Sequence, residues 1–402
     1  MAAPVPGGCP PFRAVPATET LARIAPFQSG MGITRIANIS GLDCIGLPVA
    51  QACRPNARSV AVSLGKGLDL GAAKASALME SVETWHAERF AGPLWHGSAN
   101  ELGRRHRLVD CAAMVQVADS RFAPTLDMLW AAAHPLGSDE PVLVPYETVH
   151  AAFVAPYPPG SGCFLASTNG LASGNDRDEA VLHGLCELVE RDADTLFQGR
   201  PQRWQTARLD PDSVDDPACA SAIAHLRSAG LLFALWDITS DLGIAAVWAR
   251  VAERPEGPGL VPAPVDGFGC HPVRAIALHR AIAEAAQGRA GLISGVRDDV
   301  AADAYQPMDD PAMLAPWRRR MEQDPTPRRF AEMPNIGVTG AAEAVAAVVA
   351  RLSARGFDEI LTIDLAPSDR PYAVVRTIVP GLEPPLHAGY APGPRARASA
   401  RQ

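Results

Sequence analysis

The chain has 402 residues, of which 48% are hydrophobic and 20% charged, and this is enough for one large domain or two closely packed ones with a buried core. The formal net charge of -8 at pH 7 removes the usual electrostatic basis for tight nucleic-acid binding, so we expect no nucleic-acid partner. The sequence has no signal peptide, no run of about 18 apolar residues and no metal-binding cysteine motif, so we expect a cytoplasmic protein without a membrane partner.

Helices and strands are predicted in a mixed order along the chain. Apolar residues at three- and four-residue steps indicate helices, and runs rich in Val, Ile, Leu and aromatic residues indicate strands. In chain order we expect a strand over 59–64, a helix over 71–90, a strand over 142–146, a helix over 176–197, strands over 231–238 and 244–251, helices over 272–290 and 340–354, and strands over 359–364 and 372–379. Because the two kinds of element do not alternate strictly, an α+β fold is favoured over a doubly wound parallel sheet.

Proline and glycine mark the boundaries of the predicted domain. They are concentrated in the first dozen residues, over 156–162 and 255–264, and after residue 380, where loops, linkers or tails are expected. We therefore predict a flexible N-terminus over 1–12, one domain over 13–386 and a flexible tail over 387–402.

Two of the predicted helices carry the motif Glu-x-x-Glu. Steps of three and four residues place such side chains on one helix face, and Ser76 lies on the same face of the first helix. Buried carboxylates repel one another unless a cation lies between them, and oxygen-only ligands suit Mg²⁺, whose shell is usually completed by water and phosphates. The candidate metal ligands are Glu80 and Glu83 in the first helix, and Glu179, Glu187 and Glu190 in the second. An acidic helix face in contact with solvent is the alternative for each pair.

Each acidic helix follows a glycine-bearing segment, and this shared layout suggests an internal duplication. Gly65-Lys66-Gly67 precedes the first helix, and Asn169-Gly170 with Gly174-Asn175 precedes the second. Such turns let backbone N–H groups approach an anion, but neither matches a P-loop or a dinucleotide motif. Taken alone, they are interpreted as ordinary hairpin turns. Lys66 either contacts a phosphate or is a solvated or structural residue, and the second interpretation is favoured.

Four stretches of the sequence resemble the YcaO family. They are GKGLDLGAAKASALMESVE, NGLASGNDRDEAVLHGLCELVER, GCHPVRAIALHRAIAEAAQGR and RTIVPGL, and the resemblance runs from about Arg13 to Leu382. It implies a YcaO-type ATP-binding fold in which the glutamates named above hold Mg²⁺ ions that bridge the phosphates of ATP. It also implies catalytic roles for Glu83, Glu190 and Arg280. The nucleotide contacts that it implies are Arg13, Thr20, Ser76, Asn175, Arg191 and Arg280.

The helix over 272–290 also has a basic face in its own right. Arg280, Glu284, Gln287 and Arg289 follow a three- and four-residue pattern, as expected of a side that faces phosphates. The alternative is an intrahelical ion pair between Arg280 and Glu284.

Members of this family phosphorylate a peptide backbone amide, so that a nucleophile can attack it. The resemblance therefore implies a peptide or protein substrate, ribosomally made, and a product that depends on the nucleophile. The compact chain, whose ending GYAPGPRARASARQ only partly matches a Pro-x-Pro-x-Pro tail, resembles members that form thioamides with a TfuA-like partner. An azoline-forming cyclodehydratase, a non-catalytic nucleotide- or peptide-binding regulator and a homodimeric assembly are the other expectations to test.

Overall fold

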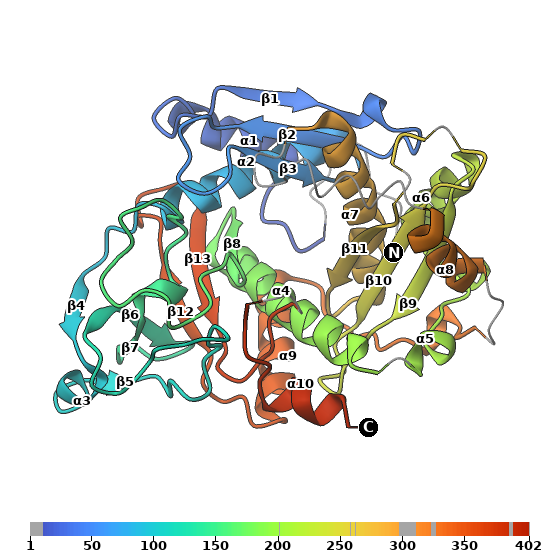
Figure 1. The fold of residues 1–402 in the computed structure, drawn as a ribbon. Coiled ribbons are helices and arrows are strands. Elements are labelled where there is room, and N and C mark those ends of the chain that lie inside the picture. The colour runs from blue at the N-terminus through green and yellow to red at the C-terminus, as the bar shows by residue number, and fades with distance from the viewer. Residues whose placement is uncertain are drawn as a thin grey trace.

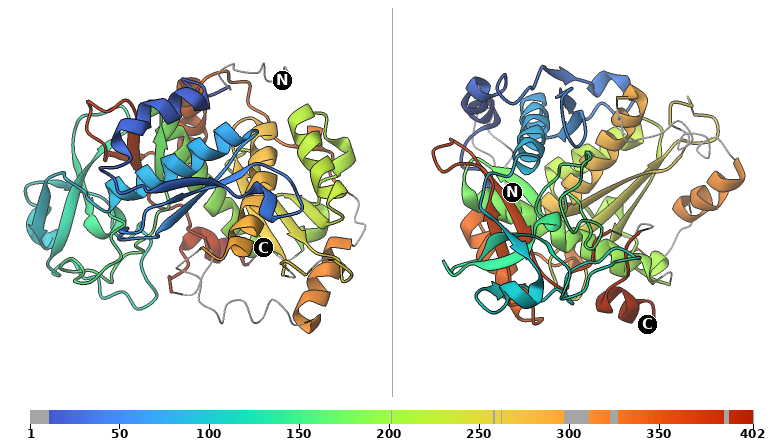
Figure 2. Two further views of the ribbon diagram at one scale, coloured as in Figure 1. Left: turned by 90° about the horizontal axis from the view of Figure 1, so that it is seen from above. Right: turned by 60° about the vertical axis from the view of Figure 1, so that its left-hand side comes forward.

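Three β-sheets and the helices between them form the fold. A computed structural model describes residues 11–200, 202–257, 259–261, 263–296, 311–322, 327–385 and 389–401. The α+β class predicted from the sequence is confirmed. Figures 1 and 2 show the long helix α4 (Arg177–Gln198) in the middle of the molecule; in Figure 1 a large sheet lies to its left, one smaller sheet lies to its right and another lies above it.

The largest sheet has the strand order β5-β7-β6-β12-β13-β8, with β4 paired to β6. All of its pairings are antiparallel except that of β5 with β7. Its strands are β4 (Leu94–Gly97), β5 (Arg107–Leu108), β6 (Met128–Pro135), β7 (Val142–Pro145), β8 (Leu171–Gly174), β12 (Leu361–Asp364) and β13 (Ala373–Ile378). Strands β8 and β13 lie against α4, and α9 (Ala341–Ser353) packs on the same helix.

Two antiparallel three-stranded sheets complete the framework. One consists of β1 (Arg35–Asn38), β2 (Val49–Cys53) and β3 (Val62–Lys66), the other of β9 (Leu232–Asp237), β10 (Ala246–Ala252) and β11 (Val265–Cys270). Helix α2 (Leu70–Ala87) covers the first of these sheets, and α7 (Arg274–Ser294) covers the second (Figure 1). The remaining α-helices of the described residues are α1 (Ala17–Ile24), α3 (Ala99–Leu102), α5 (Arg203–Thr206), α6 (Pro217–Ser228), α8 (Pro311–Glu322) and α10 (Pro394–Ser399).

Glycines allow the helices to lie directly on the strands. A Cβ atom on Gly65 would lie 2.1 Å from the backbone nitrogen of Ala77 in α2, and one on Gly269 would lie 2.1 Å from the carbonyl oxygen of Ala277 in α7. The hairpin-turn interpretation of Gly65 is therefore wrong, because β3 continues through this residue to Lys66. The glycine is required by close helix packing and not by a turn.

The two acidic helices begin in the same way. Asp69 caps α2 by accepting a hydrogen bond of 2.8 Å from the backbone nitrogen of Ala72. In the same way, Asp176 caps α4 by accepting a hydrogen bond of 2.9 Å from the backbone nitrogen of Glu179. In both cases the capping aspartate follows a strand that ends in a glycine-bearing segment. The repeated layout read from the sequence is thus present as strand, aspartate cap and acidic helix.

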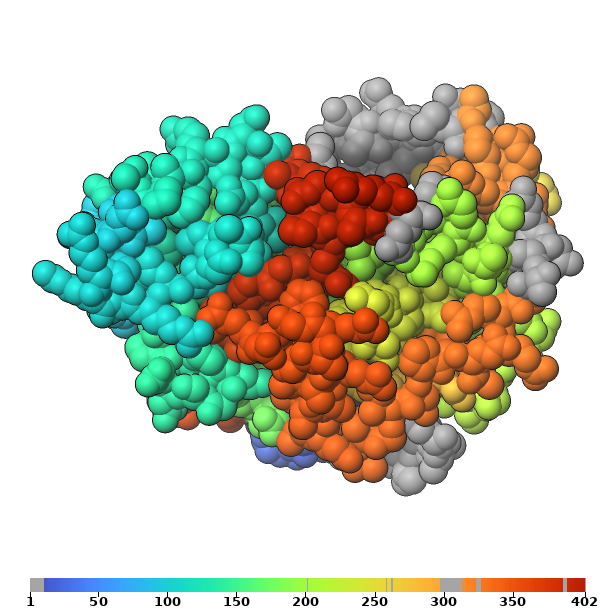
Figure 3. Space-filling view, turned by 90° about the horizontal axis from the view of Figure 1, so that it is seen from below, coloured from blue at the N-terminus to red at the C-terminus, as the bar shows by residue number. Residues whose placement is uncertain are grey.

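The C-terminal segment lies against α4. Predicted as a flexible tail from residue 387, it is described over residues 389–401 and ends in α10. Arg395 forms ion pairs with Asp192 (2.8 Å) and Asp241 (2.7 Å), and Glu383 accepts hydrogen bonds from the backbone nitrogens of Gly393 and Ala396. Figure 3 shows this segment in red on the face seen from below. Its mobility in solution, like the boundary at 387, stays a prediction.

Over the described ranges, none of the helices is both long and apolar enough to cross a membrane.

Candidate active site

Helices α2 and α4 bring their carboxylates together over strand β8. The Oε1 atom of Glu83 accepts hydrogen bonds from the backbone nitrogen (2.8 Å) and the hydroxyl (2.6 Å) of Ser173. Three residues earlier, the backbone nitrogen of Gly170 donates a 3.2 Å bond to Oε2 of Glu187. One short segment therefore fixes an acidic side chain from each helix, and the two Glu-x-x-Glu motifs face the same space.

The carboxylates of this site perturb one another. Burial raises the pKa of Glu83 to about 8, and the charges of Glu80 and Glu187 add to the effect. Burial also raises the pKa of Glu187, and it raises that of Glu190 to about 7, with Glu284 and Glu187 contributing repulsion. Buried carboxylates with such raised pKa values form a donor set whose charge a divalent cation would offset, so the residues present fit the Mg²⁺ implied by the sequence.

In the part of the chain that the structure describes, no three His, Cys, Asp or Glu side chains lie close enough together to hold a metal ion by themselves, so a Mg²⁺ ion bound here would also need oxygen ligands from water or phosphate.

Glu179 lies two turns before Glu187 on α4 and anchors the N-terminal segment. Its carboxylate accepts hydrogen bonds from the backbone nitrogen of Ala14, from Arg13 (3.3 Å), and from the backbone (3.1 Å) and side chain (3.1 Å) of Asn175. These hydrogen bonds tie Glu179 to the start of the chain and to Asn175, and not to the other carboxylates. Its expected role as a metal ligand stays a prediction, and the geometry gives it a separate role in holding Arg13.

The predicted N-terminal nucleotide contacts meet the start of α4. Thr20 on α1 is buried, and its hydroxyl donates a 2.8 Å hydrogen bond to Oδ1 of Asn175. Because Arg13 and Asn175 share Glu179, the structure brings Arg13, Thr20 and Asn175 together, although Asn175 comes more than 150 residues after the other two. Ser76 and Glu80 lie partly exposed on successive turns of α2.

A group of cations lies beside the carboxylates. Burial and the charges of Arg280, Arg13 and Lys66 lower the pKa of His183 on α4 well below its usual value. Burial and the charges of Arg280 and Arg13 lower the pKa of His271 to about 3. Since these three cations act on the same imidazole, they surround one region, and a polyphosphate is an anion of suitable charge for it.

The two histidines are part of the site that sequence reasoning missed. His183 could have been found, because it lies four residues before Glu187 and therefore on the same face of α4. His271 follows β11 directly, and that strand was itself not predicted.

Glu284 pairs with Lys66 and not with Arg280 within its own helix. Its Oε2 atom lies 2.7 Å from Nζ of Lys66, and its Oε1 atom accepts a 3.3 Å bond from the backbone nitrogen of Phe268. Burial opposes ionisation of Glu284, but Lys66 and Arg191 lower its pKa overall. Lys66 therefore forms a structural ion pair, in agreement with the structural interpretation of this residue.

Arg289 does not belong to the phosphate-facing side of α7. Its buried guanidinium pairs with Asp43 (2.9 Å) and Glu253 (3.2 Å). The prediction that placed Arg289 with Arg280 on one basic face is wrong, because these two side chains point to different partners. Arg280 acts on Glu190 and on the two histidines.

Arg376 is a buried cation beneath the carboxylates that the sequence did not single out. Its guanidinium donates to the carbonyl oxygens of Val149 (3.1 Å) and Asn169 (2.9 Å). Burial lowers its pKa to about 10, although Glu187 and Glu83 favour its charged form. It is the arginine of RTIVPGL, a stretch that matched the family without indicating a role for this residue.

These features define an α+β protein with an acidic site on two helices and a cationic region beside it. Residues 64–383, well over half of the chain, match the family described as YcaO cyclodehydratase, ATP- and Mg²⁺-binding. The chain therefore belongs to the YcaO family. Proteins of this family are ATP-dependent peptide-modifying enzymes, and the cofactors are ATP and Mg²⁺.

Relatives match nearly the full length of the chain. A protein of Rhizobium leguminosarum bv. trifolii, described by its position in the tfuA 3′ region, is 36% identical over 388 residues, which cover 94% of this chain and 90% of the relative. A protein of Methanothermobacter thermautotrophicus is 34% identical over 383 residues, which cover 92% of this chain and 95% of the relative.

Solved structures share the fold. The YcaO protein of Methanopyrus kandleri, bound with AMPPCP and Mg²⁺, has a TM-score of 0.71 at 25% identity and 92% coverage of both chains. A heterocyclase in complex with substrate and cofactor has a TM-score of 0.75 at 23% identity, and the match covers 93% of this chain and 53% of the other. The second likeness concerns the fold alone.

Proposed function

We propose that this protein uses ATP and Mg²⁺ to phosphorylate the oxygen of a peptide backbone amide, and that the product is a thioamide. The observation that carries the proposal is the meeting of the α2 and α4 carboxylates over β8, next to the cations Arg13, Lys66 and Arg280. Acidic ligands for a metal and basic ligands for phosphates are the two parts that phosphoryl transfer needs, since such catalysis is mainly positioning and electrostatic stabilisation.

The metal would be held by the Glu-x-x-Glu residues of the two helices. Bound there, Mg²⁺ would offset the negative charge of the phosphates during transfer. The candidate ligands are Glu80, Glu83, Glu187 and Glu190, and the raised pKa values of Glu83 and Glu190 support them because such carboxylates are stabilised by a nearby cation.

The basic and polar residues would hold the nucleotide. Arg280 and Arg13 would neutralise phosphate oxygens, and Asn175, positioned by Thr20 and Glu179, would bind nearby. Arg191 lies 3.6 Å from Glu190 and would fix that carboxylate while facing the reacting groups. Ser76 would contribute its hydroxyl from α2.

The reaction then needs no nucleophile from the protein. The amide oxygen of the substrate attacks the terminal phosphorus of ATP, and ADP leaves. A sulfide adds to the activated carbon, and inorganic phosphate departs with the former amide oxygen. The site's contribution is to bind both reactants next to each other and to stabilise the charge that moves between them.

Sulfide is favoured as the nucleophile by one relative. The R. leguminosarum protein, at 36% identity, is described by a position next to tfuA, and we extend this to a TfuA-like partner for the present chain. Mass spectrometry of a modified peptide distinguishes the products, because a thioamide exchanges oxygen for the heavier sulfur whereas an azoline loses water.

Conservative substitution of the glutamates tests the proposal. Glu83→Gln and Glu190→Gln remove a charged metal ligand at almost constant volume, so we expect ATP turnover with peptide and sulfide to fall by at least about a hundredfold, as for loss of a catalytic electrostatic group. Binding of a Mg²⁺–AMPPCP mixture, measured by calorimetry, should weaken in parallel. Glu332→Gln, on an exposed side chain remote from α2 and α4 in sequence, is the matched control. Wild-type turnover in both site variants would rule out the metal site.

A further inference from the structure

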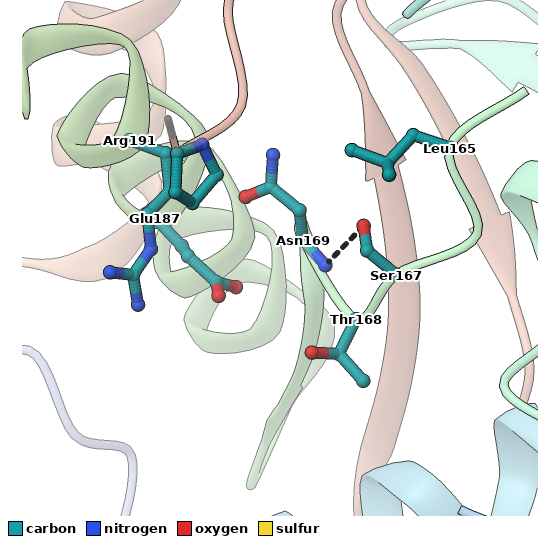
Figure 4. Close-up of a pocket in the computed structure, with 7 residues that line it drawn as sticks. Leu165, Ser167, Thr168, Asn169, Glu187 and Arg191 are labelled. Carbon is teal, nitrogen blue, oxygen red and sulfur yellow. Dashed lines mark hydrogen bonds between the residues drawn. The ribbon is translucent and has the colours of Figure 1, made fainter. Parts of the chain in front are cut away.

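A small pocket lies beside the acidic site, and no ligand is assigned to it above. It has a volume of about 160 Å³ and borders on Glu187 and Arg191 of α4. The rest of its lining comes from the segment before β8 and from the C-terminal segment, namely Leu165, Ser167, Thr168, Asn169 and Pro385. Figure 4 shows the side chain of Asn169 between Glu187 and Arg191 on one side and Leu165 and Ser167 on the other.

The size and chemistry of this pocket suit a peptide unit and not a nucleotide. Sites for drug-sized ligands have volumes of about 300–1,000 Å³, and 160 Å³ corresponds to about five water molecules. Leu165 and Pro385 are apolar, and Ser167, Thr168 and Asn169 are neutral. Among the described residues of the lining, Arg191 is the one cation, and Glu187 beside it is acidic; Arg13, Lys66 and Arg280 are not part of it, so a triphosphate has few partners here.

Asn169 presents an unused amide oxygen. Its Oδ1 atom is shielded from solvent and has no hydrogen-bond partner among the described residues. An acceptor left in this state has lost its hydrogen bonds to water without a replacement, so a ligand that donates a hydrogen bond would be favoured. A side-chain amide has the same donor and acceptor groups as a peptide bond, and a backbone N–H is a natural partner for it.

The backbone around Asn169 is held rigidly and is connected to the acidic site. Arg376 donates to the carbonyl oxygen of Asn169 (2.9 Å), and the hydroxyl of Ser167 accepts from its nitrogen (3.3 Å). The next residue, Gly170, has φ of +80°, and a Cβ atom there would lie 2.3 Å from the carbonyl oxygen of Thr377. Because the backbone nitrogen of Gly170 donates a hydrogen bond to Glu187, the backbone that carries Asn169 is fixed relative to that carboxylate.

We propose that this pocket binds the peptide backbone next to the amide that is phosphorylated, and that Oδ1 of Asn169 accepts a hydrogen bond from a backbone N–H of the substrate. The inference rests on the proposed function and adds the place where the substrate backbone lies. In this arrangement the target amide is presented beside Glu187 and Arg191, while the nucleotide occupies the adjoining cationic region.

The test uses acetyl-tetraglycine amide, which offers backbone amides and no side chains. Saturation-transfer NMR is recorded on the full-length protein with Mg²⁺ and AMPPCP, and calorimetry measures AMPPCP binding in the same samples. We expect wild-type protein to bind the peptide, and Asn169→Leu to bind it about tenfold more weakly, as expected for one lost hydrogen bond and an apolar replacement. Acetyl-tetrasarcosine dimethylamide, which lacks N–H donors, should not bind.

Asn56→Leu, at an exposed asparagine in a turn, is the matched control, and Asn169→Ala serves if the leucine variant does not fold. Equal peptide binding by wild type and the folded Asn169 variants, or none by wild type, would overturn the inference. Loss of AMPPCP binding in the Asn169 variants would also overturn it, because Asn169 would then belong to the nucleotide site. Failure of wild-type protein to bind AMPPCP with Mg²⁺ would instead contradict the proposed function.

Discussion

Glu83 couples the stability of the metal-free protein to pH. Its pKa is raised from 4.5 to about 8, so between these values the folded protein binds a proton that the unfolded chain releases. The free energy of unfolding should therefore fall as the pH rises through this window. We expect urea unfolding in EDTA to give lower stability near pH 8.5 than near pH 6, and a weaker dependence in Glu83→Gln. An unchanged dependence in this variant, with Glu332→Gln as control, would contradict the assignment.

Magnesium and protons should compete for the same carboxylates. Binding of the cation requires Glu83 and Glu190 to be ionised, and their pKa values of about 8 and about 7 mean that each is partly protonated near neutrality. We expect Mg²⁺ with AMPPCP to raise the melting temperature more near pH 8.5 than near pH 6, because ligand stabilisation grows with affinity. Calorimetry in buffers of different ionisation enthalpy should detect proton release on binding. A melting-temperature shift independent of pH would argue against carboxylate ligands.

At the residue scale, the sequence predicted the acidic positions better than their partners. Helical spacing is enough to place Glu80 with Glu83 and Glu187 with Glu190, because it depends only on local geometry. By contrast, the contacts of Glu179 with Arg13 and of Arg376 with Val149 join segments more than 160 residues apart. Neither pairing follows from any local pattern, so the roles of Glu179 and Arg376 needed the fold.

At the scale of elements, close contact between β3 and α2 makes Gly65 sensitive to substitution. A Cβ atom there would approach backbone atoms of Ala73 and Ala77, and these cannot move without shifting the helix. We expect Gly65→Ala to lower the free energy of unfolding by about 1–3 kcal/mol, as for overpacking of a core, and to reduce ATP turnover because α2 carries Glu80 and Glu83. Gly41→Ala has open space around the new methyl group and should change stability little. Equal stability of the two variants would show that α2 can shift freely.

The same packing explains why four of the helices were predicted and why strand β11 was missed. The helices over 71–90, 176–197, 272–290 and 340–354 all exist with ends shifted by a few residues, because their periodic apolar faces match buried sides. Strand β11 was missed because Gly267 and Gly269 weaken the strand pattern. Both glycines admit the backbone of α7, which is a tertiary cause that composition does not reveal.

At the scale of the whole molecule, the C-terminal segment connects to the interior through one aspartate. Asp192 has no exposed surface, and it lies nearly opposite Glu190 on α4, so its partner has to come from the side away from the acidic site. Arg395, more than 200 residues later, supplies the charge. The abundance of Pro, Gly, Ala and Arg after residue 387 predicted mobility because such composition lacks an apolar pattern, and a single buried ion pair leaves no trace in composition.

Removing Arg395 should therefore destabilise the protein although its own side chain is near the surface. Burial already raises the pKa of Asp192, and without the guanidinium this carboxyl must take up a proton or remain charged in the interior. We expect Arg395→Ala to lower the free energy of unfolding by about 3 kcal/mol, and to increase protease cleavage within 389–401. Arg227→Ala, which breaks an exposed ion pair with Asp212, should cost less than about 1 kcal/mol.

A double variant separates the ion pair from the packing of α10. In Asp192→Asn with Arg395→Ala the unpaired charge is absent, so part of the lost stability should return, and urea unfolding of the four proteins gives the coupling energy. If the double variant is no more stable than Arg395→Ala, the segment is held by Glu383 and by packing, and the Asp192 pair contributes nothing of its own. Recovery of stability without recovery of protease resistance would mean that Arg395 also positions the segment that ends beside the pocket at Pro385.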